Sequence, residues 1–254
     1  MKSFSSLVRV VFCLTVLPGL LLFPAPTRVD LHQTFLPTFA SMEHPLGTDR
    51  LGRDIYALYC YGILGTIFTA IPARILTLAF STVLSLFSYI ALPSWQYILR
   101  TIASVFLSLP SLLVALVIVG SLGTSFWVVL VAIVVSDWAL AYESIQTKVR
   151  DIQSAGYVIA ASSMGAGKVH IFKNHIFSQL RSIQYVLFIT GIPAVIMTIA
   201  IFSFLGIDFS GELWGPGLGE QISFAKDFYS KSPMSVLVPA IGIFLLVYSF
   251  GKGK

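Results

Sequence analysis

The chain has 254 residues, of which 56% are hydrophobic and 11% are charged, with a net charge of +5 and a mean hydropathy of +0.88. A soluble domain carries about a quarter of its residues as charges, so this composition excludes an ordinary soluble protein and indicates a membrane protein. The two cysteines, Cys13 and Cys60, have no metal-ligand spacing and cannot form a disulfide framework.

Six apolar runs approach or exceed the roughly 20 residues that a helix needs to cross a bilayer. The sequence therefore predicts an all-α membrane protein with six transmembrane helices. The second run is too long for one perpendicular crossing, so we expect it to tilt or to end outside the bilayer. In chain order the runs are residues 7–23, 62–92, 101–120, 124–142, 183–206 and 233–250.

The first run has two interpretations. Lys2 and Arg9 precede the apolar residues and Ala25 lies near their end, which is the layout of a cleaved signal peptide. Pro24 and Pro26 disturb the small-x-small pattern that cleavage needs, so we favour an uncleaved helix.

The distribution of charge predicts the orientation. With the N-terminus inside, the inner segments hold ten Lys and Arg residues and the outer segments hold five, while eight of the 11 acids fall outside. The positive-inside rule therefore predicts that both termini are cytoplasmic. No basic face lies outside the membrane, so the charge does not indicate nucleic-acid binding. We expect an N-terminal segment, residues 1–61, then a membrane domain, residues 62–250, with a large inner loop at residues 145–181.

One outer stretch, "HPLGTDRLGRD", runs from His44 to Asp54 just before the second apolar run. Its glycines permit tight turns, and its charged side chains can hold the loop together through ion pairs and backbone hydrogen bonds. The loop is either a lid beside a pathway mouth, where a partner docks, or a structural cap on the helices. The residues of interest are His44, Pro45, Gly47, Asp49, Arg50, Gly52, Arg53 and Asp54.

The inner loop predicts two helices. The first has Asp151 or Ser154 as a possible N-cap, Ala160 and Ala161 as a surface nearly free of side chains, and Gly165 as a left-handed end. The second follows Gly167 and has one apolar stripe with polar residues elsewhere. The stripe consists of Val169, Phe172, Ile176 and Leu180, and the polar residues include Lys168, Lys173 and Asn174. Such helices could dock in a partner's groove or lie on lipid headgroups.

"GAGK" at residues 165–168 suggests a phosphate-binding loop, but the required pattern is G-x-x-x-x-G-K-[ST]. Ser162 stands at the first glycine position and Val169 follows the lysine, so the motif fails twice. If ATP drives this protein, another chain binds it.

Arg74 and Asp137 lie within apolar runs at similar depths. A charge at the centre of a helix costs about 2.5–3.5 kcal/mol on insertion scales, so each should face the bundle or water. Their depths permit a pair, although we favour separate wet or snorkelling positions. The sequence offers no catalytic, metal or cofactor-binding set, and His170 and His175 are not spaced to share a helix face.

From residue 44 onward, four landmarks in order resemble the C-type membrane permease subunit of dipeptide, oligopeptide and nickel ABC importers. The stretch from His44 to Asp54 resembles that family's outer signature. "LRTIASVFLSLPSLLVAL" resembles its third helix, and "YVIAASSMGAG" resembles its ATPase-coupling loop. "FSFLG" with "LWG" resembles the end of its fifth helix and the loop that follows.

Three positions depart from the pattern. Ile159 stands where the coupling glutamate is usual, Ser178 stands at the proline of the family's I-L-P, and Ala103 replaces an aspartate of the third helix. These changes leave docking plausible and weaken its polar part. The residues that the resemblance assigns to coupling are Tyr157, Ile159, Ala160, Ala161, Met164 and Gly165.

The resemblance implies the fold of a type I ABC importer permease in the bacterial cytoplasmic (inner) membrane, with an N-terminal helix and outer loop before the core. Its partners would be a homologous second permease, two ATPase subunits that bind ATP and Mg²⁺, an outer substrate-binding protein and membrane lipid. The chain would move di- or oligopeptides and would not itself be an enzyme. Alternatives are a nickel or metal-chelate importer, an ion-coupled secondary transporter, and a membrane scaffold that transports nothing.

Overall fold

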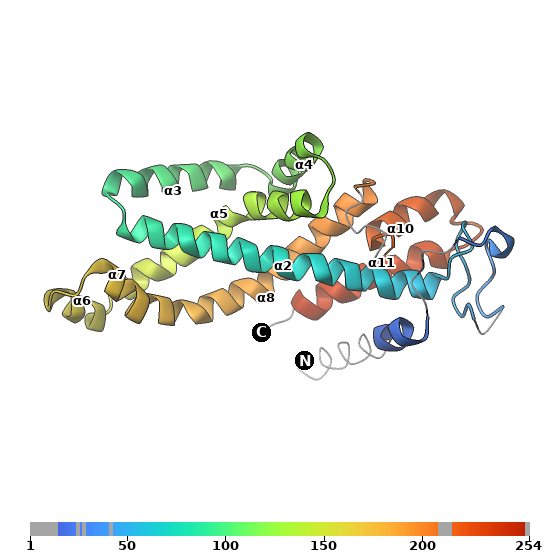
Figure 1. The fold of residues 1–254 in the computed structure, drawn as a ribbon, viewed down its shortest axis with the longest axis horizontal. Helices are drawn as coiled ribbons and strands as arrows, with labels where there is room; N and C mark the ends of the chain where they lie inside the picture. Colours follow the sequence, from blue (N-terminus) through green and yellow to red (C-terminus); the bar gives the residue numbers. More distant parts are fainter. Residues whose placement is uncertain (1–14, 24–25, 27–28, 41–42, 208–214, 252–254) are drawn as a thin grey trace. The chain divides into compact units, whose positions relative to one another are not determined.

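The computed structural model describes residues 15–23, 26, 29–40, 43–207 and 215–251. These residues are mostly helical, and the only strand-like feature among them is an isolated antiparallel bridge between Thr48 and Asp54. The predicted all-α class is therefore confirmed for the described part of the chain. Figure 1 shows the elements in chain order: η1 (Leu31–Gln33), α2 (Ile55–Ile90), α3 (Pro93–Ser108), α4 (Ser111–Leu122), α5 (Phe126–Gln153), α6 (Gly156–Ser163), α7 (Lys168–Ile171), the π-helix η2 (Phe172–Ile176), α8 (Phe177–Phe204), α10 (Leu218–Ala225), η3 (Lys226–Phe228) and α11 (Met234–Gly251).

Four helical runs are long and apolar enough to cross a membrane singly: α2, α5, α11 and the continuous run of α7, η2 and α8. They confirm four of the predicted apolar runs as helices, although α2 begins earlier than expected and α5 continues to Gln153. The pair α3 and α4 makes a fifth candidate span. Most of the first predicted run lies outside the described residues, within which residues 15–22 are helical. The count of six therefore stays a prediction.

The predicted helix at residues 101–120 is wrong as a single rod, because the chain bends by 93° between α3 and α4. Leu109 and Pro110 both have extended backbones, with ψ of 138° and 117°. Proline has no N–H to donate, and its ring disfavours the helical conformation at the preceding residue. Figure 1 shows the sharp turn that results.

The described residues pack as two compact units. The first holds those within residues 1–71, 124–127 and 192–254, and the second holds those within residues 72–123 and 128–191. In the first unit, a buried glutamine fixes α10 against the start of α2. The Gln221 amide nitrogen donates to the carbonyls of Leu58 (2.8 Å) and Pro216 (2.9 Å). Gly62 leaves room for it, since a Cβ there would lie 2.6 Å from that nitrogen. The predicted domain boundary at residues 61 and 62 falls inside α2.

In the second unit, α2 turns a row of small hydroxyl residues inward: Thr77, Ser81, Ser85 and Ser88 are all buried. Ser81 donates to the carbonyl of Trp138 in α5 (3.0 Å), and Gln184 of α8 donates to Thr82 (3.0 Å). Lipid removes most of the hydrophobic force between helices, so small residues and interhelical hydrogen bonds provide the packing. This unit carries the inner loop on α5 and α8.

Candidate functional site

The outer stretch His44–Asp54 is held together by Asp49. Its Oδ1 accepts the backbone N–H groups of Leu51 (2.8 Å) and Arg53 (2.9 Å), and its Oδ2 accepts from Arg53 Nε (2.8 Å) and Nη2 (2.7 Å). Both guanidinium nitrogens share Oδ2, and hydrogen bonds of this kind are among the stronger polar contacts because both groups are charged. The ion-pair part of the sequence prediction is thus confirmed for Asp49 and Arg53.

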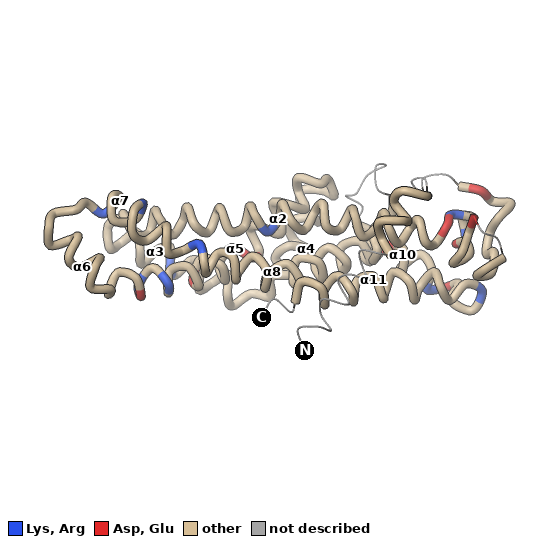
Figure 2. Tube along the Cα trace, turned by 90° about the horizontal axis from the view of Figure 1, so that it is seen from below, with Lys and Arg blue, Asp and Glu red and all other residues tan. Residues whose placement is uncertain are grey.

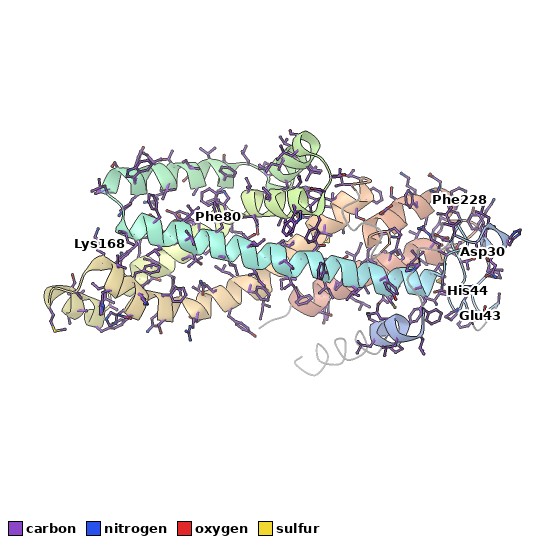
Figure 3. All side chains as sticks on the ribbon, viewed as in Figure 1. Asp30, Glu43, His44, Phe80, Lys168 and Phe228 are labelled. Atoms are coloured by element: carbon purple, nitrogen blue, oxygen red, sulfur yellow. The ribbon has the colours of Figure 1, made fainter. Side chains whose placement is uncertain are left out.

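Asp54 joins the same loop to helix α2. Its Oδ1 accepts the N–H of Ala57 (2.7 Å) at the helix start, and its Oδ2 lies 3.0 Å from His44 Nδ1. The other ring nitrogen of His44 lies 2.8 Å from Gln33 Oε1. Figure 3 shows His44 close to the described residues around Asp30 at this end of the first unit. A carboxylate at a helix N-terminus satisfies free N–H groups and complements the helix dipole.

Gly52 has a left-handed backbone, with φ of +71°, and its Cα faces the chain at Asp30. A Cβ at Gly52 would lie 1.7 Å from the Asp30 carbonyl oxygen. Gly47 is similar, with φ of +82° and a Cβ position 2.3 Å from the Leu36 oxygen. Pro45 contributes its carbonyl to the N–H of Phe39 (3.2 Å). The tight turns that the glycines predict are confirmed, and they seat the loop on residues 30–39.

Arg50 was expected to form an ion pair within the loop, but it contacts aromatic rings instead. Its guanidinium lies over the rings of Phe224 (4.9 Å) and Phe228 (5.7 Å), on the α10 and η3 segment. Ser232 also donates to the Thr48 carbonyl at 3.5 Å. Residues 44–54 therefore pack on the segment of residues 218–232, and Asp49 and Asp54 are 8% and 9% exposed. This geometry joins the loop to α2 and to the α10 segment, and a docking role for it stays a prediction.

In the loop that the sequence predicts to lie inside, α6 ends as predicted at Gly165, which has φ of +87°. The N–H of Ala166 bonds the Ala161 carbonyl (3.1 Å) and that of Gly165 bonds the Ser162 carbonyl (3.0 Å), the pattern of a Schellman C-cap. The predicted N-cap is wrong. Asp151 lies within α5 because α5 extends to Gln153, and Ala155 occupies the N-cap of α6 without a side-chain bond.

The exposed face of α6 is apolar and large rather than nearly free of side chains. Tyr157, Ile159 and Met164 are 46%, 54% and 82% exposed, and Ala160 is exposed between them. Ala161 is buried instead, together with Val158. The small-residue surface was predicted from two adjacent alanines, but neighbours on a helix point about 100° apart and cannot share a face.

The stripe after Gly167 is confirmed at Phe172, Ile176 and Leu180, which are buried against α5. The prediction for Val169 is wrong, because this side chain is 59% exposed and Ile171 is buried instead. Residues 172–176 form a π-helical turn, so residues five apart, such as Ile171 and Ile176, come onto one face. The stripe packs inside the protein, so it is not free to lie on lipid headgroups.

Arg74 and Asp137 form an ion pair, contrary to the separate positions favoured above. Arg74 Nη1 lies 2.7 Å from Asp137 Oδ2, and Nε and Nη2 donate to the Leu187 carbonyl at 3.0 and 2.6 Å. Arg74 is 4% exposed. A Cβ on Gly191 would lie 2.1 Å from the guanidinium carbon, so this glycine makes the space for it. One arginine therefore joins α2, α5 and α8.

Comparison of the sequence with known proteins identifies the family of this chain. Residues 81–251, about two thirds of the chain, match the family described as the binding-protein-dependent transport system inner membrane component. The chain belongs to this family. The match begins after residues 44–54 and after Arg74.

Three relatives in different systems have similar identities. The nickel transport system permease protein NikC of Escherichia coli (strain K12) is 26% identical over 227 residues, 89% of this chain and 80% of that protein. The dipeptide permease protein DppC of Alkalihalophilus pseudofirmus is 28% identical over 210 residues, and the oligopeptide permease protein OppC of Bacillus subtilis is 25% identical over 212. Each of these two alignments covers 83% of this chain and 68% of the relative. The chain is thus a multi-pass permease subunit of an ABC importer.

Sequence reasoning missed three residues that shape these sites. Gln221 and Leu187 are distant in sequence from the groups that they contact, and a backbone carbonyl such as that of Leu187 leaves no signal in the side-chain pattern. Gly191 is a lone glycine inside a predicted span, which is a weak signal for close approach to another helix.

Loop geometry predicts a difference between two glycines of the permease. Both glycines have positive φ, but only at Gly52 would a new Cβ meet a carbonyl oxygen, that of Asp30. Gly52→Ala should therefore destabilise the protein more than Gly165→Ala. Gly165 has nothing within 4 Å of that position, so its change should cost only about 1–2 kcal/mol for the left-handed backbone. Thermal unfolding of the two detergent-purified variants measures this, and equal losses would contradict the close approach.

The ion pair predicts an asymmetry between single and double variants. Asp137→Leu should cost about 3–5 kcal/mol because it leaves Arg74 charged and buried without its partner. Arg74→Met/Asp137→Leu should recover most of that loss, since no buried charge remains. The control is Glu143→Leu, which breaks the more exposed pair with Arg150 and should cost less than about 1 kcal/mol. Unfolding in a denaturing detergent titration gives all three values, and a double variant as unstable as the single one would refute the asymmetry.

Proposed function

We propose that this permease moves di- or oligopeptides across the bacterial cytoplasmic membrane, using ATP hydrolysed by separate subunits. The observation that carries the proposal is α6, a short helix with an exposed apolar face held between two long helices. Membership of the family supports the importer function, and α6 offers the surface that an ATPase subunit would bind. The positive-inside rule puts this surface in the cytoplasm, with both chain termini on the same side.

ATP and Mg²⁺ would bind to the partners and not to this chain. Residues 165–168 form the turn between α6 and α7, where Gly165 closes one helix and Lys168 opens the next. A phosphate-binding loop needs a hydroxyl after the lysine and an earlier glycine, and the chain has Val169 and Ser162 at those positions. The full assembly would contain two such ATPases and a homologous second permease.

The packing supports a route for the motion. Val158 of α6 is buried in a cluster with Ile152 of α5 and with Phe172 and Ile176 of η2. A push on α6 would therefore be carried by close-packed side chains into α5 and α8 as one body, because packed interiors resist local compression. ATP binding would favour one of two arrangements of the permease pair, and hydrolysis would release it.

At the outer side, a binding protein would deliver the peptide near the cap formed by residues 44–54 and the α10 segment. The carboxylates of this cap are engaged in holding the loop, so the partner would read the shape of the cap and its exposed rim. Nickel is the second candidate substrate, because a nickel-system permease is as similar to this chain as the peptide-system permeases are.

Assembly depends on Ile159 in this proposal. Ile159→Asp should reduce the amount of ATPase that co-purifies with the permease about tenfold or more, because an unpaired carboxylate would enter an apolar contact. Gln179→Asp is the control: it places the same charge on an exposed residue that belongs to α8 and not to α6. Equal co-purification of the two variants would overturn the assignment of α6 as the ATPase contact.

Uptake by the reconstituted assembly tests the substrate. Vesicles containing both permeases, the ATPases and the binding protein should accumulate labelled dipeptide when ATP is supplied, and accumulation should stop with Ile159→Asp. Accumulation of labelled nickel instead would assign the second candidate. ATP-independent uptake driven by an ion gradient would indicate a secondary transporter, and partners that co-purify without uptake of either substrate would indicate a scaffold.

A further inference from the structure

A polar cavity of about 350 Å³ lies within the second unit, between the end of α2, the start of α3 and the last turns of α5. This volume is in the range of small-ligand sites. Its lining is unusually polar for a chain of this composition. The polar side chains that matter here are Gln96, Tyr97, Arg100, Glu143, Gln146 and Arg150.

The cavity carries a net positive charge, and one of its cations is uncommitted. Arg150 donates to Glu143 (2.9 Å) and Thr147 (3.1 Å). Arg100 makes no side-chain hydrogen bond or ion pair with the residues that the structure describes. A guanidinium with its donors free beside a second arginine suits an anion with several acceptor oxygens, such as a phosphate group. Figure 2 shows several Lys and Arg positions, in blue, near α3, α6 and α7 in this unit.

The segment of residues 92–98, which we call the α3 rim, exposes apolar and aromatic side chains. Tyr97 lines the cavity and is 73% exposed. Leu92, Trp95 and Ile98 do not line the cavity and are 69%, 52% and 43% exposed. Trp and Tyr are the residues that membrane proteins place at the level of lipid headgroups. An amphiphile would therefore meet acyl-chain surface outside the cavity and cationic donors inside it, which a free phosphate could not exploit.

We propose that this cavity binds the phosphate of an anionic phospholipid headgroup. Arg100 and Arg150 hold the phosphate oxygens, the amide of Gln153 is placed to contact the polar part of the headgroup, and the acyl chains lie along the exposed α3 rim. Basic pockets between membrane helices are a recognised form of headgroup site. This inference does not depend on the transported substrate or on ATPase binding.

The position of the cavity gives the lipid a consequence for α6. Arg150 and Gln153 lie in the last turns of α5, and only Ser154 and Ala155 separate α5 from α6. Tyr89 lines the cavity and its ring also contacts Phe172 (5.6 Å), in the cluster that supports α6. A bound headgroup would therefore tie the end of α5, which leads into α6, to the end of α2 and the start of α3.

The test measures lipid retention directly. The full permease assembly is reconstituted in nanodiscs of phosphatidylcholine and phosphatidylglycerol in equal parts, extracted into mild detergent, and its retained phosphatidylglycerol counted by native mass spectrometry. Arg100→Gln should reduce retention about fivefold, which is the typical contribution of one basic residue near an anionic lipid. Arg100→Lys should recover part of it, since the charge returns without the planar fork.

Arg181→Gln is the matched control, because Arg181 is an exposed basic residue of α8 that does not line the cavity. Retention should be unchanged in this variant, and all variants should keep the wild-type melting temperature. Equal losses in Arg100→Gln and Arg181→Gln would replace the site with general surface attraction and overturn the proposal. Displacement of the lipid by glycerol 3-phosphate at matched concentration would assign the cavity to a free phosphate compound and overturn the lipid assignment. These measurements need neither transport nor ATP hydrolysis, so they separate this proposal from the importer function.

Discussion

The guanidinium of Arg74 is the contact on which the membrane part of this fold depends most. It is buried in an apolar helix bundle, where a lone charge would be strongly unfavourable, and it is compensated by Asp137 from α5 and the Leu187 carbonyl from α8. Asp137 accepts from Nη1 of the guanidinium, and the Leu187 carbonyl accepts from Nε and Nη2, so each partner satisfies only part of the group. The three helices can keep this arginine buried only in an arrangement close to this one, so the cost of an unpaired charge specifies how they pack. Gly191 supports the same arrangement by leaving the space that the guanidinium occupies.

The loop of residues 44–54 follows the same physical rule with different groups. Asp49 and Asp54 are nearly buried carboxylates, and each accepts backbone N–H groups as well as a basic side chain. Their hydrogen bonds close the loop on itself and on the start of α2, so the first turn of a long helix begins at a fixed place. Arg50 then packs over two aromatic rings of the α10 segment, which joins the two outer segments of the chain. The charges of the signature are therefore mainly structural, and any docking role uses the surface that they hold in place.

The sequence was a good guide where one physical signal dominated. Apolar length located the helices, and glycines with an obligatory positive φ located the turns at Gly52 and Gly165. It failed where two signals competed. The hydropathy of residues 101–120 hid the break at Leu109 and Pro110, because apolar composition does not report backbone breaks. Periodicity assigned Val169 to the buried stripe, because the π-helical turn that exposes it leaves no mark in a pattern of 3.6 residues. The similar depths of Arg74 and Asp137 permitted a pair but did not predict it. The other acceptor for Arg74 is the Leu187 carbonyl, a backbone group that no side-chain pattern reveals.

The departure at Ile159 has a physical meaning in this setting. Residues 152–207 contain no acidic side chain, so neither α6 nor α7 presents a carboxylate of its own. Tyr157, Ile159 and Met164 supply apolar area at the centre, and Lys168 follows at the start of α7. A contact of this kind gains its free energy from burying surface rather than from an ion pair, and desolvating apolar groups costs less than desolvating a carboxylate. A partner surface with an apolar groove and an acidic rim would match it, and replacing a glutamate by isoleucine then changes how the contact is stabilised without removing it.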